Sequence, residues 1–81
     1  MNSVRRMSDT VYSIVKRIDP TVIVQRAFYD EISGRLFVSL VKGRQEYEFG
    51  LPARYFSNGD LELVSGALKD GIDRMVKQPL S

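Results

Sequence analysis

Residues of high strand preference run through the middle of the chain, from Thr21 to Leu51. Two turn signals interrupt them: the run Glu31–Gly34, and Gly43 with one neighbour, Lys42 or Arg44. Short strands separated by tight turns pair with their neighbours in the chain. This stretch therefore predicts a three-stranded antiparallel meander.

The segment before the meander has helical spacing. Its apolar residues recur at intervals of three and four and form one stripe: Val4, Met7, Val11, Ile14, Val15 and Ile18. Ser3 or Ser8 is the expected N-cap. The helix should end at Asp19-Pro20, because the residue before a proline is driven out of the helical region.

A second helix is predicted after the meander, with Pro79 ending it. Ser57 is the expected N-cap, with Asp60 as a short capping-box acid and Phe56 against Leu61 as a hydrophobic staple. Its expected apolar stripe comprises Leu61, Val64, Leu68, Ile72 and Met75, flanked by Ala67 and Val76. Gly66 and Gly71 each cost about 1 kcal/mol relative to alanine. They indicate either a close approach of another group or a helix broken near Gly71.

These elements predict an α+β fold: a single two-layer domain over residues 1–81, in the order α-β-β-β-α, with both helices on one sheet face. A two-residue turn at Gly43 brings six apolar side chains onto the inner face: Leu36, Val38, Leu40, Tyr47, Phe49 and Leu51. A four-residue first turn pairs Tyr29 with Leu36 and Ala27 with Val38, which keeps Arg26 outside. An odd-length loop would bury Arg26 without a partner, at a cost of several kcal/mol.

Regular alternation under this register points Ile23 inward and leaves a mixed outer face. Its apolar members would be Val22, Val24, Phe28, Phe37 and Val41, and its polar members Arg26, Ser39, Glu46 and Glu48. Apolar residues on a face without helices are typical of an interface. The residues predicted to form this interface are Val22, Val24, Arg26, Phe28, Phe37, Val41 and Glu48.

The residue types limit the chemistry available. The 81 residues include no cysteine and no histidine, so thiolate and imidazole nucleophiles, bases and metal ligands are missing. Glu46 and Glu48 share one side of a strand about 7 Å apart, but they are expected to be paired or solvated carboxylates, with Arg26 as one partner. The chain has no histidine to act as a base for a serine nucleophile. We therefore expect no enzyme, no cofactor and no metal site.

The charge distribution is uneven along the chain. The net charge is +2, from 12 basic and 10 acidic residues. Residues 1–44 carry eight basic and four acidic side chains, and residues 45–81 carry four and six. The two halves, +4 and −2, would attract each other within one subunit or between subunits.

A nucleic-acid-binding module is the alternative function, with Arg35, Lys42 and Arg44 as the contacts at the hairpin ends. The order helix, three strands, helix is similar to that of double-stranded-RNA-binding domains, a similarity of topology alone. That family has a lysine-rich start to its last helix, whereas residues 58–62 here are acidic.

The sequence favours a non-catalytic protein-interaction module that forms a homodimer, or binds another protein, through the outer sheet face. Nucleic acid is a less favoured partner. No apolar run is long enough to span a membrane, and the basic start has no apolar core behind it, so no secretory signal is expected. The cytoplasm is the expected location.

Overall fold

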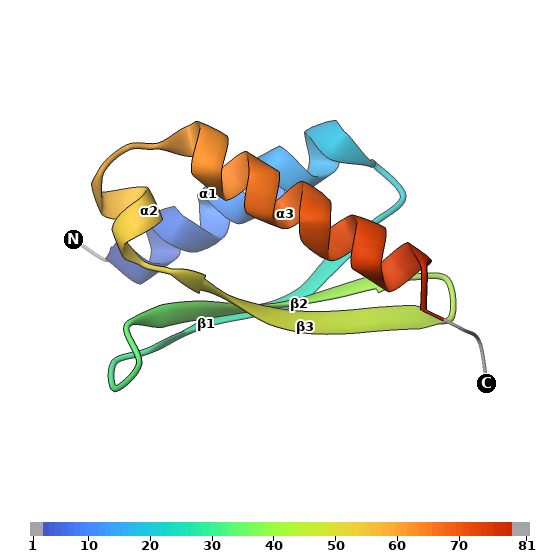
Figure 1. Ribbon diagram of the computed structural model, residues 1–81, viewed down its shortest axis with the longest axis horizontal. Coiled ribbons are helices and arrows are strands. Elements are labelled where there is room, and N and C mark those ends of the chain that lie inside the picture. Colours follow the sequence, from blue (N-terminus) through green and yellow to red (C-terminus); the bar gives the residue numbers. More distant parts are fainter. Residues whose placement is uncertain (1–2, 79–81) are drawn as a thin grey trace.

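The computed structural model describes residues 3–78, and it has the predicted α+β order with one additional short helix. The elements are α1 (Ser3–Ile18), β1 (Ile23–Asp30), β2 (Arg35–Lys42), β3 (Gln45–Pro52), α2 (Arg54–Ser57) and α3 (Leu61–Val76). The strands form one antiparallel sheet in the order β1-β2-β3. Both long helices lie on the same side of this sheet, which gives two layers (Figure 1).

The core lies between the helices and the inner sheet face. Thirteen apolar side chains are buried there: Met7, Val11, Val15, Val22, Val24, Leu36, Val38, Leu40, Leu51, Val64, Leu68, Ile72 and Met75. The predicted stripe of α1 is confirmed, with Ile14 and Ile18 partly buried beside it. The side chain of Val4, the capping role of Ser3 and the role of Pro79 lie outside the described residues. Ser8 lies within α1, so it is not the N-cap.

The start of α3 differs from the prediction. Its N-cap is Asp60, whose carboxylate accepts a hydrogen bond from the Leu63 backbone N–H. Ser57 instead ends α2, and Gly59 turns the chain between the two helices with a φ of +66°. Leu61 is the first residue of α3, and it is 57% exposed, so it does not belong to the buried stripe.

α3 is continuous through both of its glycines. A Cβ atom at Gly66 would meet open space, whereas one at Gly71 would lie 2.5 Å from Cε1 of Phe49. The close approach predicted from these glycines is therefore confirmed at Gly71, where the Phe49 ring of β3 lies against the helix backbone. The predicted break near Gly71 does not occur.

The two turns and the register beyond them match the prediction. Tyr29 pairs with Leu36 and Ala27 with Val38, across a four-residue turn that ends in Gly34. Gly34 has a φ of +67°, a left-handed conformation that favours glycine. The second turn has two residues, Gly43 and the next, between paired flanking residues of β2 and β3.

The first strand contains a β-bulge that the sequence analysis did not predict. Val24 pairs with Leu40 and Arg26 pairs with Ser39, so Gln25 is an extra residue on β1. A bulge of this kind shifts the side-chain alternation by one position. Residues before Gln25 therefore point to the opposite face from the one that regular alternation assigns.

The bulge makes the predicted placement of Val22, Val24 and Ile23 wrong. Val22 and Val24 are each 7% exposed and belong to the core, whereas Ile23 is 63% exposed on the outer face. Burying a valine side chain is worth about 1.5–3 kcal/mol. The bulge therefore allows two valine side chains to be buried and leaves one isoleucine side chain exposed. The Gln25 side chain is exposed as well.

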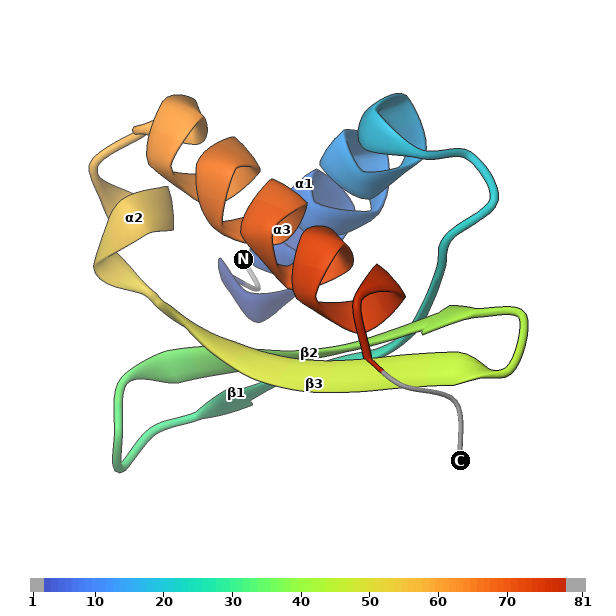
Figure 2. The ribbon, with the colours of Figure 1, turned by 45° about the vertical axis from the view of Figure 1, so that its right-hand side comes forward.

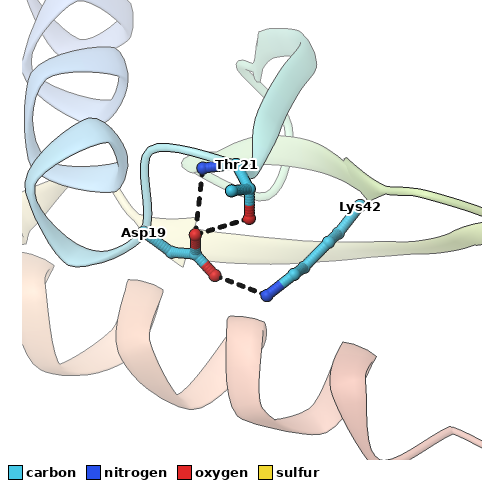
Figure 3. A network of polar contacts seen from close by, with 3 residues as sticks. All are labelled: Asp19, Thr21 and Lys42. Atoms are coloured by element: carbon cyan, nitrogen blue, oxygen red, sulfur yellow. Dashed lines mark hydrogen bonds and ion pairs between the residues drawn. The ribbon is translucent and has the colours of Figure 1, made fainter.

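A network of polar contacts fixes the connection between α1 and β1 (Figure 3). The Asp19 carboxylate accepts hydrogen bonds from the Thr21 backbone N–H at 2.9 Å and its hydroxyl at 2.6 Å. Its second oxygen lies 2.7 Å from Nζ of Lys42, at the end of β2. The hydrogen bond from Lys42, helped by those from Thr21, lowers the pKa of Asp19 to about 2.

Candidate protein interface

The outer face of the sheet has no helix over it, since α1 and α3 both lie on the other side (Figure 2). Strand pairing arranges its side chains in four rows that cross from β1 through β2 to β3. The rows are Ile23, Val41 and Glu46; Arg26, Ser39 and Glu48; Phe28, Phe37 and Gly50; and Asp30, Arg35 and Pro52. We name the second the charged row and the third the aromatic row.

The aromatic row forms a flat apolar layer across the sheet. The Phe28 and Phe37 rings are stacked, with centroids 5.4 Å apart and an interplanar angle of 25°. A Cβ atom at Gly50 would lie 3.1 Å from Cε1 of Phe37, so that ring extends toward the backbone of β3. Phe28 is 42% exposed although its ring is stacked. Water therefore contacts an aromatic surface that nothing in the described chain covers.

The charged row lies directly beside the aromatic row. Nη2 of Arg26 lies 3.3 Å from Oε2 of Glu48, across the width of the sheet. The Arg26 guanidinium also lies over the Phe28 ring, 5.4 Å from its centroid. Both side chains of the ion pair are about half exposed or more, so the pair contributes little to folding. Its charges are available to a partner.

The structure brings together five of the seven residues predicted for this interface: Arg26, Phe28, Phe37, Val41 and Glu48. Val22 and Val24 do not belong, because both are in the core. Ile23 is the residue that sequence reasoning missed. The sequence feature that could have identified it is the consecutive polar pair Gln25-Arg26. Regular alternation would have buried one of these two side chains, which indicates a bulge instead.

The three basic residues of the nucleic-acid alternative are not brought together. Arg35 and Lys42 lie at opposite ends of β2, roughly 23 Å apart along the strand. Lys42 forms the ion pair with Asp19 described above. Only Arg44, in the second turn, lies near Lys42. The predicted phosphate contacts therefore do not form one basic surface.

Among residues 3–78, no three acidic side chains come close enough to hold a metal ion. In the same range, no helix has both the length and the apolar character that crossing a membrane requires. No protein-family profile, no curated protein and no solved structure matches this chain. The surface chemistry described above is therefore the basis for any assignment of function.

Proposed function

We propose that the protein is a non-catalytic interaction module that binds a second copy of itself through the outer sheet face. The observation that carries this proposal is the uncovered aromatic row, with Phe28 and Phe37 stacked on the face opposite the helices. Ile23 and Val41 extend the apolar surface beyond the charged row. Surfaces of this kind lose contact with water when two copies pack face to face.

The face is complementary to itself about one particular axis. A two-fold axis parallel to β2 would bring β1 of one copy opposite β3 of the other. Residues of the same row would then face each other, so Arg26 would oppose the partner's Glu48. Phe28 would oppose the partner's Gly50, which has no side chain, and Phe37 would meet its own counterpart. An axis perpendicular to the strands and passing through the charged row would instead place Arg26 opposite its own counterpart, which is unfavourable.

The size of the face limits the affinity. Strands of eight residues extend about 26 Å, and three of them are about 14 Å wide, so two copies would cover roughly 750 Å² in total. Stable protein interfaces bury about 1,200–2,000 Å², and smaller ones belong to weak, transient complexes. We therefore expect a dissociation constant of tens to hundreds of micromolar, on the order of −5 to −7 kcal/mol.

The geometry gives less support to nucleic acid as the partner. The three basic residues are separated, and Glu46 and Glu48 occupy the β3 side of the same sheet face. Two carboxylates on the face that carries the aromatic row would repel a phosphate backbone. The cytoplasmic location expected from the sequence stays a prediction.

Sedimentation velocity over a concentration series from about 10 µM to 1 mM would test the proposal. The wild type should shift from monomer toward dimer, and Phe28→Glu should stay monomeric. Tyr12→Glu on α1 is the matched control, because Tyr12 is an aromatic residue with 48% exposure, close to the 42% of Phe28. It should associate like the wild type.

Two results would contradict the proposal. One is a wild type that stays monomeric at the highest concentration. The other is a folded Phe28→Glu variant, with a wild-type circular dichroism spectrum, that associates as well as the Tyr12→Glu control does.

A further inference from the structure

The two edges of the sheet differ in a way that matters for binding. The β1 edge is interrupted by the bulge at Gln25, a feature that hinders pairing with a further strand. The strand β3, at the other edge, pairs with β2 along its whole length without a register shift. β3 therefore presents a regular strand edge.

The hydrogen-bonding groups on that edge follow from the turn. Residues that flank a two-residue turn, here Lys42 and Gln45, exchange both backbone hydrogen bonds, and every second pair does the same. At the far end Ala53 N–H donates to the Gly34 carbonyl at 2.9 Å, which fits this alternation. The backbone groups of three residues between these ends therefore point away from the sheet: Glu46, Glu48 and Gly50. Pro52 follows at the next such position and has no N–H to offer.

A groove of about 270 Å³ runs beside this edge, between β3 and α3. Its lining includes Tyr47 and Phe49 of β3, Tyr55 of α2, and Asp70, Gly71 and Arg74 of α3. At one end Tyr47 and Asp70 hold the Arg74 guanidinium and raise its pKa. The Gln45 side chain donates to the carbonyls of Val76 and Gln78, which fastens the end of α3 to the hairpin. The groove therefore has two fixed walls.

We propose that the β3 edge binds an extended peptide segment in which apolar residues alternate with lysine or arginine, as an added fourth strand that runs antiparallel to β3. Residues of the segment directly opposite Glu46 and Glu48 would share their sheet face, where a basic side chain gives a favourable cross-strand pair. The residues between them would point to the other side, toward the aromatic and glycine-lined groove. Strand addition of this kind combines backbone hydrogen bonds with pockets for alternate side chains. It shares the Glu48 side chain with the outer-face dimer, but its backbone hydrogen bonds and its groove are separate from that dimer and do not depend on it.

A second copy of this chain fits the edge poorly. Symmetric pairing of two β3 edges brings Glu46 opposite the partner's Glu48, or Glu48 opposite its own counterpart, and like charges directly opposite are destabilising. If the register shifts further, Glu46 lies opposite the partner's Pro52, which has no backbone N–H and cannot donate a hydrogen bond. The acidic edge therefore selects a basic segment from another chain.

The test uses a short capped peptide of alternating lysine and valine, titrated into the isotope-labelled protein and followed by nuclear magnetic resonance. Binding should slow hydrogen exchange at the amides of Glu46, Glu48 and Gly50 by about tenfold or more at saturation. A peptide N-methylated at its lysines should not bind, because those N–H groups face β3. One N-methylated at its valines, whose N–H groups face away, should bind.

Charge is tested by one variant and its control. Glu46→Lys should weaken binding of the lysine–valine peptide about three- to tenfold. Glu62→Lys, the same change on the exposed first turn of α3, should leave it unchanged. The proposal is overturned by absence of binding at millimolar peptide, by equal binding of a glutamate–valine peptide, by equal binding of the lysine-methylated peptide, or by equal effects of the two variants.

Discussion

Replacing Gly66 of α3 by alanine should stabilise the protein, whereas the same change at Gly71 should leave its stability unchanged or lower it. Both changes remove glycine from a helix interior, which is worth about 1 kcal/mol. At Gly66 the new methyl group meets open space, so the whole gain should remain. For a domain of this size it corresponds to a rise in Tm of about 4–8 °C.

At Gly71 the same methyl group would lie 2.5 Å from Cε1 and 2.6 Å from Cζ of Phe49. The ring would have to move by about 1 Å within a packed layer, and overpacking of this kind costs about 1–3 kcal/mol. Gly71→Ala should therefore be about 1–3 kcal/mol less stable than Gly66→Ala. Thermal and denaturant unfolding would measure both.

A third variant identifies the clash as the cause. Phe49→Leu removes the ring atoms that the methyl group meets, so adding Gly71→Ala to it should cost less than in the wild type. The resulting coupling in a double-mutant cycle should be about 1 kcal/mol. Equal stabilisation by the two alanine variants would refute the packing of Phe49 against α3.

Two further predictions concern the connections between elements. The folded-state pKa of Asp19 is depressed to about 2, so its stabilising effect is complete above its unfolded value near pH 4 and is lost as the pH falls through 2. The Tm difference between the wild type and Asp19→Asn should therefore be largest near neutral pH and shrink as the pH falls from about 4 through 2; a difference that does not shrink over this range would contradict the network of Figure 3. Asp60→Ala should lower the free energy of unfolding by about 1 kcal/mol through loss of the α3 cap, while Ser57→Ala should change it by less than about 0.5 kcal/mol. A larger loss of unfolding free energy in Ser57→Ala than in Asp60→Ala, measured by urea unfolding, would indicate that Ser57 is the cap.

Most of the fold could be predicted because local signals agreed with one another. The glycines of both turns, Gly34 and Gly43, occupy the positive-φ positions that only certain turn lengths allow. The register then followed from keeping the charge of Arg26 out of the core. The inner-face alternation of β2 and β3 is confirmed by Leu36, Val38, Leu40 and Leu51, which are at most 1% exposed.

The error in β1 arose because a single extra residue changed a periodic pattern. A bulge adds one residue and leaves composition unchanged, so Val22 and Val24 satisfied the strand pattern equally well on either face. The start of α3 was misplaced because Ser57 and Asp60 are both good N-caps. The intervening Gly59, with its φ of +66°, decides between them by turning the chain after α2.

The groove beside β3 could not be predicted from the sequence. It depends on how closely α3 approaches the sheet, and that distance is set by Gly71 against Phe49. The sequence indicated a close approach at one of two glycines, but it could not identify the ring involved. Acidic residues at 46 and 48 were visible, whereas the direction of their backbone groups required the register of β3 against β2.

The outer-face dimer is tested most directly by two variants with opposite charge changes in the charged row. In a homodimer of either single variant, Arg26→Glu or Glu48→Arg, like charges would face each other across the two-fold axis. In a mixed dimer, the carboxylate introduced at position 26 of one variant would oppose the guanidinium introduced at position 48 of the other. The native Glu48 of the first would oppose the native Arg26 of the second, so attraction is restored at both positions.

Sedimentation of the mixture should therefore detect a heterodimer, while each variant alone stays monomeric. Arg17→Glu and Glu62→Arg, which make the same charge changes on exposed positions of α1 and α3, are the control pair, and mixing them should add nothing to their separate association. No association in the mixed charged-row variants, at concentrations where the wild type dimerises, would contradict the proposed pairing.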